Sequence, residues 1–171
     1  MAQKGLKGTE VEEGTPAQRP IRAPRGFHPA RVDEKGRLKF PTNFQEYLNS
    51  LDDKVFFVTT MGRGIVRVYP NSVWEQNEKF FNEHIEDPKA AQRLAFMANA
   101  YGGDVQMDGQ GRVLLPAKLR QSLELENSAV QLLIYRERID IYKQSMFDEQ
   151  MKEAEAAIGG DLDALERNGL R

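Results

Sequence analysis

The chain has 171 residues, a net charge of −2 at neutral pH and no cysteine. The small negative charge argues against indiscriminate nucleic-acid binding, so a nucleic-acid site would have to be a local basic patch. Without cysteine there are no disulfides or thiolate metal ligands. Because no apolar run approaches the roughly 20 residues that cross a bilayer, we expect a cytoplasmic protein without a membrane partner.

Residues 1–24 are rich in Gly, Pro, Thr and charged residues. This composition buries too little apolar surface to offset the entropy of ordering the chain, which predicts a disordered N-terminal extension. Arg19, Arg22 and Arg25 stand at its end. A solvated linker is the favoured interpretation of these arginines, and cations that follow a nucleic-acid backbone are the alternative.

A tight turn is predicted at residues 33–36, because Asp is favoured at the first position and Gly at the fourth position of a type I turn. The next residues alternate between charged and apolar side chains, which is typical of a half-buried strand. Pro41 suits the first position of a helix. The buried face of that helix is predicted to consist of Phe44, Tyr47, Leu48 and Leu51.

Residues 54–60 and 65–69 are β-branched and aromatic runs on either side of a glycine-containing loop, which predicts a β-hairpin. Asn71 or Ser72 is expected to cap the helix that follows. A second helix is predicted from Asp87-Pro88 to Tyr101, with apolar residues repeating every three or four positions. Its predicted buried stripe is Leu94, Met97, Ala98 and Tyr101.

The segment 32–41 has a second copy 75 residues later, at 107–116. The identical pairs are Asp33/Asp108, Gly36/Gly111, Arg37/Arg112 and Pro41/Pro116. Because the match continues beyond these motifs, the chain is predicted to contain two units of roughly 65 residues each. The predicted divisions are a first repeat at 25–74, a helical connector at 75–103, a second repeat at 104–147, and a C-terminal helix with a polar tail at 148–171. This helix is amphipathic and is expected to end near Gly159-Gly160.

The two hairpins differ in charge. Alternate positions of the first carry four cations and one carboxylate, a net charge of +3: Arg31, Asp33, Lys35, Arg37 and Lys39. The corresponding positions of the second carry a net charge of −1: Asp104, Gln106, Asp108, Gln110 and Arg112. Only the first face is therefore suited to phosphates. A simpler role for Asp33 and Arg37 is a salt bridge that fixes the turn.

No catalytic constellation is found. His28 and His84 are the only histidines and fall in different predicted elements, so sequence neighbours build neither a metal site nor a His-based triad. The motif Gly62-x-Gly64 lacks the third glycine of a dinucleotide loop, and Gly109-x-Gly111 precedes a strand rather than a helix. We expect no enzymatic activity, cofactor, metal or small-molecule substrate.

The repeats resemble the MraZ family of bacterial transcriptional regulators. The resemblance covers about residues 25–150 and includes both Asp-x-x-x-Arg motifs, the Tyr69-Pro70 then Trp74 pattern, and Gly102-Gly103 before the second repeat. It implies an α+β fold in which two tandem swapped-hairpin AbrB-like domains form a pseudo-symmetric, double-ψ-like β-barrel core with flanking helices.

The resemblance also implies a ring-shaped homo-oligomer that is associated with the nucleoid. It would bind promoter direct repeats in double-stranded DNA upstream of the division and cell-wall gene cluster and regulate its own operon. An oligomeric protein-interaction or assembly module of the same fold is the alternative.

The candidate residues follow from the resemblance and the charge pattern together. Arg37 and Lys35 stand at the family's DNA-contacting positions, while Asp33 and Gly36 would shape the loop. The planar fork of Arg37 suits a guanine edge, whereas Lys35 and Lys39 suit phosphate. The full DNA-binding set is Arg25, Arg31, Lys35, Arg37 and Lys39. The second motif, with Asp108, Gly111 and Arg112, is expected mainly to serve assembly.

Overall fold

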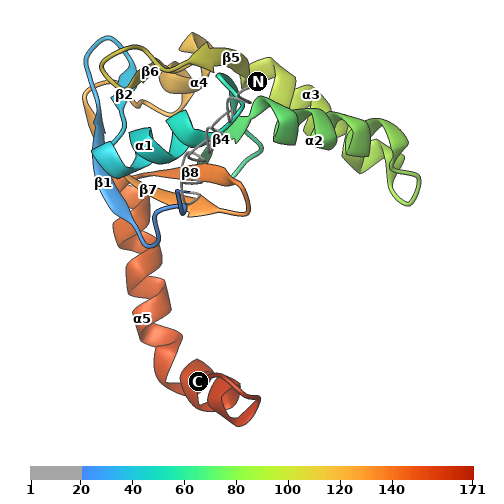
Figure 1. Ribbon diagram of the computed structural model, residues 1–171. Helices are drawn as coiled ribbons and strands as arrows, with labels where there is room; N and C mark the ends of the chain where they lie inside the picture. Colours follow the sequence, from blue (N-terminus) through green and yellow to red (C-terminus); the bar gives the residue numbers. More distant parts are fainter. Residues whose placement is uncertain (1–20) are drawn as a thin grey trace, which may run out of the picture.

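The computed structural model describes residues 21–171, which form one eight-stranded antiparallel sheet and five helices (Figure 1). The disordered extension expected over residues 1–24 lies outside the described residues except for 21–24, which have no regular secondary structure. Among the described residues, no helix combines the length and the apolarity needed to cross a membrane.

The two repeats have the same order of elements. The first contains β1 (His28–Val32), β2 (Arg37–Lys39), α1 (Thr42–Ser50), β3 (Val55–Thr60) and β4 (Val66–Pro70). The second contains β5 (Gly103–Gln106), β6 (Arg112–Leu114), α4 (Ala117–Ser122), β7 (Ser128–Tyr135) and β8 (Arg138–Lys143). The remaining helices are α2 (Asn71–Glu83), α3 (Pro88–Tyr101) and α5 (Gln144–Arg167).

The repeats interlock strand by strand. The sheet order is β5-β3-β4-β8-β7-β1-β2-β6, so β1 pairs with β7 of the other repeat and β3 pairs with β5. The two terminal strands of this order, β5 and β6, are consecutive in the chain and touch each other. The sheet therefore closes almost completely into a barrel, which confirms the predicted pair of swapped-hairpin units.

Both repeats fill the barrel with equivalent side chains. Leu38 and Phe40 alternate with the outward cations Arg37 and Lys39 in the first repeat. Val113 and Leu115 alternate with the outward Arg112 and Leu114 in the second. Each of the four inward side chains is at most 1% exposed. Burial of a large apolar side chain contributes about 1.5–3 kcal/mol, so the shared interior supplies stability that neither small unit could generate alone.

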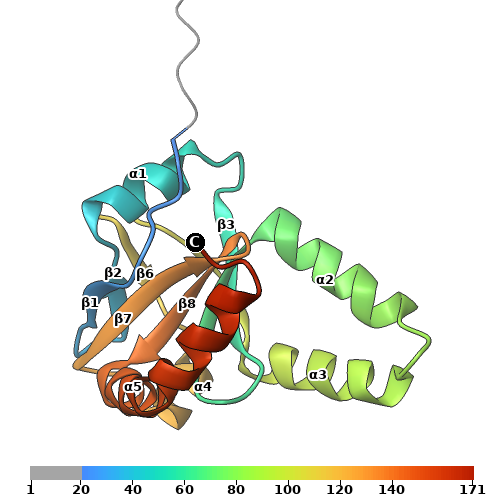
Figure 2. The ribbon, with the colours of Figure 1, turned by 90° about the horizontal axis from the view of Figure 1, so that it is seen from below.

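The connecting helices lie outside the barrel. α2 and α3 run antiparallel and project from one side, while α5 extends away from the body and changes direction toward its C-terminal end (Figures 1 and 2). Trp74 on α2 stacks on Phe57 of β3 with ring centroids 4.2 Å apart, which ties the helical pair to the sheet. The predicted stripe on α3 is only partly correct, because Leu94 is exposed and Ala91 is buried together with Ala98.

Two predicted helix starts are wrong in detail. Pro41 is the residue before α1 rather than its first helical residue. Pro70 likewise precedes α2, and neither Asn71 nor Ser72 caps it from the N-cap position. The carboxylate of Asp53 instead accepts hydrogen bonds from the Ser72 N–H and hydroxyl at 2.9 and 2.7 Å. Asp53, which lies between α1 and β3, thus satisfies one N–H group in the first turn of α2.

The C-terminal helix is longer than predicted. α5 passes through Gly159-Gly160 and ends at Arg167, although each glycine costs about 1 kcal/mol relative to alanine. Strong helix formers on both sides offset that cost, so the pair does not terminate the helix. Four exposed apolar side chains recur along it: Met151, Ile158, Leu162 and Leu165.

Candidate nucleic-acid interface

The loop between β1 and β2 is folded by the side chain of Asp33. Its Oδ1 accepts hydrogen bonds from the N–H groups of Lys35 and Arg37, both at 2.9 Å. The Gly36 N–H donates to the Asp33 carbonyl at 3.1 Å, with Gly36 at a φ of +79°. That left-handed conformation favours glycine, so the predicted tight turn is confirmed.

The second oxygen of Asp33 orients Arg37. Arg37 Nε donates to Asp33 Oδ2 at 2.7 Å, and the Arg37 side chain remains 33% exposed. Neither Nη atom of Arg37 has a hydrogen-bond partner among residues 21–171. The Arg37 backbone N–H is the main group that lowers the pKa of Asp33, against partial desolvation, so the carboxylate is ionised at neutral pH.

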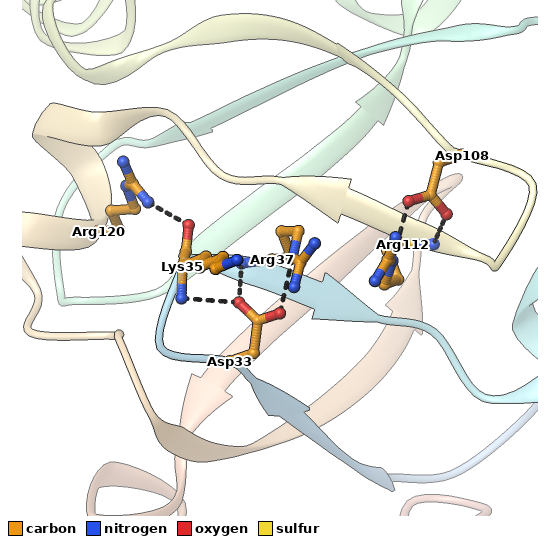
Figure 3. A network of polar contacts seen from close by, with 6 residues as sticks. All are labelled: Asp33, Lys35, Arg37, Asp108, Arg112 and Arg120. Carbon is orange, nitrogen blue, oxygen red and sulfur yellow. Dashed lines mark hydrogen bonds and ion pairs between the residues drawn. The ribbon is translucent and has the colours of Figure 1, made fainter.

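The second repeat reproduces this geometry (Figure 3). Asp108 Oδ1 accepts from the N–H groups of Gln110 and Arg112 at 2.9 and 3.0 Å, and Arg112 Nε donates to Asp108 Oδ2 at 2.9 Å. Gly111 takes a φ of +74°. The salt bridge inferred as the simpler role of the motif is therefore present in both loops, and it leaves the exposed end of each guanidinium available.

Four cations gather on one face of β1, β2 and β6. Arg31 lies directly opposite Lys39, and Lys39 lies directly opposite Arg112, so one residue from each strand stands in a line. Arg37 is two residues from Lys39 and points to the same face. We call Arg31, Arg37, Lys39 and Arg112 the basic row.

The basic row borders a hollow of about 500 Å³. Like charges directly opposite one another destabilise a sheet. Two carboxylates, on Asp33 and Asp108, are already paired with Arg37 and Arg112 of the row, and Glu34 also lines the hollow. Such a cluster of cations is suited to an anionic ligand.

Arg112 was expected to serve the assembly role of the second motif. The pairing of β2 with β6 instead places Arg112 on the same face as the cations of the first motif.

Lys35 and Arg25 occupy different positions relative to the basic row. Lys35 is exposed at the tip of the loop, beside the row. Arg25 is also exposed, but it precedes β1 and so lies at the strand end opposite to the loop. A five-residue strand spans about 16 Å, so Arg25 is separated from the other predicted cations.

Two residues of the second repeat contact the loop and were not identified from the sequence. The Asn127 N–H donates to the Asp33 carbonyl at 3.1 Å, and Asn127 Oδ1 accepts from Arg31 Nη2 of the adjoining β1 at 2.8 Å. Arg120 Nη1 donates to the carbonyl of Lys35 at 2.6 Å. The one available signal was the repeat spacing, because Arg120 is 75 residues after Gln45 on the equivalent helix. Equivalence alone does not reveal a contact across repeats.

Neither histidine belongs to the basic row, because His28 lies on the opposite side of β1 from Arg31 and His84 follows α2. His28 packs on the ring of Phe44 and His84 on that of Phe80, with centroids 5.1 and 4.8 Å apart. Within residues 21–171, no three His, Asp or Glu side chains are grouped to hold a metal ion.

Two interlocked hairpin repeats that close a barrel, each with an Asp-x-x-x-Arg loop, define a tandem AbrB-like protein. A family model described as "MraZ protein" matches residues 96–167. The chain is 34% identical to the transcriptional regulator MraZ of Acidobacterium capsulatum, over 85% of this chain and 99% of that protein. The chain belongs to the MraZ family.

Further relatives carry the same name. The transcriptional regulator MraZ of Koribacter versatilis is 39% identical over 60% of this chain and 70% of that protein. The one of Nitrosospira multiformis is 32% identical over 83% of this chain and 96% of that protein. The similarity thus extends over both repeats.

Proposed function

We propose that this protein is a DNA-binding transcriptional regulator that reads double-stranded DNA with its β1–β2 hairpin. Its targets are direct repeats upstream of the division and cell-wall gene cluster, through which it regulates its own operon. The observation that carries this proposal is the basic row beside the loop, in a chain whose net charge is −2. The names of its relatives support the same function.

The proposed roles follow from side-chain chemistry. Arg37 donates both Nη groups to the O6 and N7 atoms of a guanine, because Asp33 occupies only Nε. Lys35, Lys39, Arg31 and Arg112 contact phosphates, which fix the position of the hairpin without reading sequence. A two-stranded ribbon fits the major groove of B-form DNA.

We further propose that several subunits act together in a ring. Large apolar side chains are exposed between α2 and α3 (Ile85, 88%), on α3 (Phe96, 78%) and on α5 (Ile158, 58%). Exposed apolar groups of this kind support subunit contacts. If the four phosphate-contacting cations neutralise about four phosphates in each subunit, the salt slope of one subunit is about −3.6. Such weak single contacts gain on the order of 10² to 10⁴ in avidity when linked, which suits repeated DNA sites.

The test compares two double variants, each of which removes two positive charges. Labelled DNA from upstream of the gene is titrated at several NaCl concentrations with the wild type, with Arg31→Gln/Lys39→Gln, and with Lys152→Gln/Arg167→Gln on α5. We expect the first variant to bind more weakly, with a salt slope smaller by about 0.9 for each phosphate that the variant no longer neutralises. The α5 variant should retain wild-type binding.

The same experiment addresses the alternative of an assembly or protein-interaction module. That alternative is supported by the exposed apolar side chains of α3 and α5. Equal effects of both variants, or none from either, would refute the role of the basic row in DNA binding and favour the assembly module.

A further inference from the structure

The backbone of the first loop is held by donors from the second repeat. Three of its four carbonyl groups, those of residues 33, 35 and 36, accept such hydrogen bonds. The pairs are Asn127 N–H with Asp33 O at 3.1 Å, Arg120 Nη1 with Lys35 O at 2.6 Å, and Leu115 N–H with Gly36 O at 3.0 Å. Of these three donors, Arg120 is the only one that uses its side chain, and the other two use backbone N–H groups.

The second loop has no equivalent of the Arg120 contact. Among the described residues, the first repeat donates to this loop only through the Phe40 N–H, which bonds the Gly111 carbonyl at 2.9 Å. Gln45 occupies the position that corresponds to Arg120 and packs over Gly111. However, its Nε2 donates to the carbonyl of Phe40 at 2.6 Å and not to the loop. The arginine therefore distinguishes the loop with the basic face from the other.

Arg120 is closely fitted to this loop. Its guanidinium covers Gly36 so tightly that a Cβ atom at that position would overlap Nη1. The Arg120 side chain is 20% exposed, its Nε is buried without a hydrogen-bond partner, and the Glu126 carboxylate lies 3.6 Å from it. A cation held in this way has given up part of its hydration, and its direct hydrogen bond is to the Lys35 carbonyl.

We propose that Arg120 is a positioning residue for DNA recognition, acting from the second repeat on the loop that presents Lys35 and Arg37. The inference rests on the proposed DNA binding. Fixing the Lys35–Gly36 peptide before binding reduces the conformational entropy that DNA binding would otherwise cost. The second repeat thereby acts on the DNA-reading loop in addition to completing the barrel.

The test uses Arg120→Gln, which introduces the residue that the first repeat carries at this position. Lys118→Gln removes the same charge from the same helix without touching the loop. We expect Arg120→Gln to lower affinity for the upstream DNA about tenfold, with an unchanged salt slope. Hydrogen exchange of the free protein should accelerate in peptides covering residues 33–38. Arg120→Lys keeps the charge but not the planar guanidinium. Its DNA affinity and its rate of hydrogen exchange should lie between those of the wild type and of Arg120→Gln. Lys118→Gln should resemble the wild type.

Three outcomes would overturn the proposal. A salt slope reduced by about one would mean that Arg120 itself contacts phosphate. Unchanged affinity together with unchanged exchange would remove the positioning role. Equal losses in Arg120→Gln and Lys118→Gln would indicate a general charge effect. Failure of the wild type to bind the DNA would instead refute the proposed function. The experiment therefore distinguishes an error in the role of Arg120 from an error in the proposed DNA binding.

Discussion

Asp33 holds the guanidinium of Arg37 through Nε alone, which donates to Oδ2 at 2.7 Å, while the backbone N–H of the same arginine donates to Oδ1 at 2.9 Å. The guanidinium is thus fixed at its base and its two Nη groups face outward. Asp108 and Arg112 repeat the arrangement with corresponding distances of 2.9 and 3.0 Å. One carboxylate therefore both shapes the turn and aims the side chain.

Replacing Arg37 with lysine should show how much of the DNA affinity depends on the planar guanidinium and how much on the positive charge alone. Arg37→Lys keeps one positive charge but loses the two parallel donors, so we expect roughly 5- to 100-fold weaker binding to the cognate repeat. Binding to unrelated DNA should change little. Fluorescence anisotropy with cognate and shuffled duplexes measures both, and Lys39→Arg serves as the control for an exchange of cation type. Retention of full cognate affinity by Arg37→Lys would show that the fork is not used.

The two motif aspartates should titrate below an ordinary aspartate. Backbone hydrogen bonds from Arg37 and Arg112 are the main causes that lower the pKa of Asp33 and Asp108. Because each pKa is lower in the folded state, ionised carboxylates stabilise the loops at a pH above the unfolded value. That stabilisation is lost as the pH falls through the folded value.

These two groups should consequently give no pH dependence of loop stability between pH 5 and 8. Carbon-detected NMR titration of the Asp33 and Asp108 carboxyl groups checks this, with an aspartate in an unstructured model peptide as reference. Midpoints at or above that of the reference would contradict the hydrogen-bonded geometry.

The stability of the protein should depend on one buried carboxylate at the centre of the sheet, that of Asp140. The Asp140 side chain is 5% exposed, lies 2.7 Å from Arg138 Nε, and stands opposite Arg67 across the β4–β8 pair. Asp140→Ala leaves both guanidinium groups without this partner, so we expect about 3–5 kcal/mol lower free energy of unfolding. Urea denaturation measures the change. Glu153→Ala, on the exposed surface of α5, should change it by less than about 0.5 kcal/mol.

Two glycines of similar backbone conformation allow a matched comparison. Gly26 and Gly36 have φ values of +81° and +79°, but only Gly36 has neighbours where a Cβ would lie. Gly26→Ala should cost about 1–2 kcal/mol of unfolding free energy from backbone strain alone. Gly36→Ala should cost more, because Arg120 must also give up its bond to Lys35. Equal losses in the two variants would mean that Arg120 moves aside freely.

The sequence was sufficient to predict features governed by local chemistry. The Asp and Gly of each loop specify a tight turn, and the alternation after Arg37 specifies a strand with Leu38 and Phe40 inward. The repeat also predicted equivalent core positions. These features depend on residues close together in the chain, where spacing determines geometry.

Features that depend on pairing between the repeats were harder to predict. The alignment made Arg37 and Arg112 equivalent, but it did not reveal that β2 pairs with β6 and brings Arg112 beside Lys39. Arg120 escaped notice for the same reason, since its contact spans 85 residues. Gly159-Gly160 was misinterpreted as a helix end because local propensity was given too much weight against the flanking helix formers.

Binding of DNA by the first hairpin of this protein is decided by the Arg37→Ala variant. Labelled DNA from upstream of the gene is titrated with wild-type and variant protein, and the mass of each in solution is measured on the same samples. We predict an unchanged mass together with loss of specific binding. An Arg37→Ala protein of the same mass that binds this DNA as tightly as the wild type would show that the first hairpin does not read it.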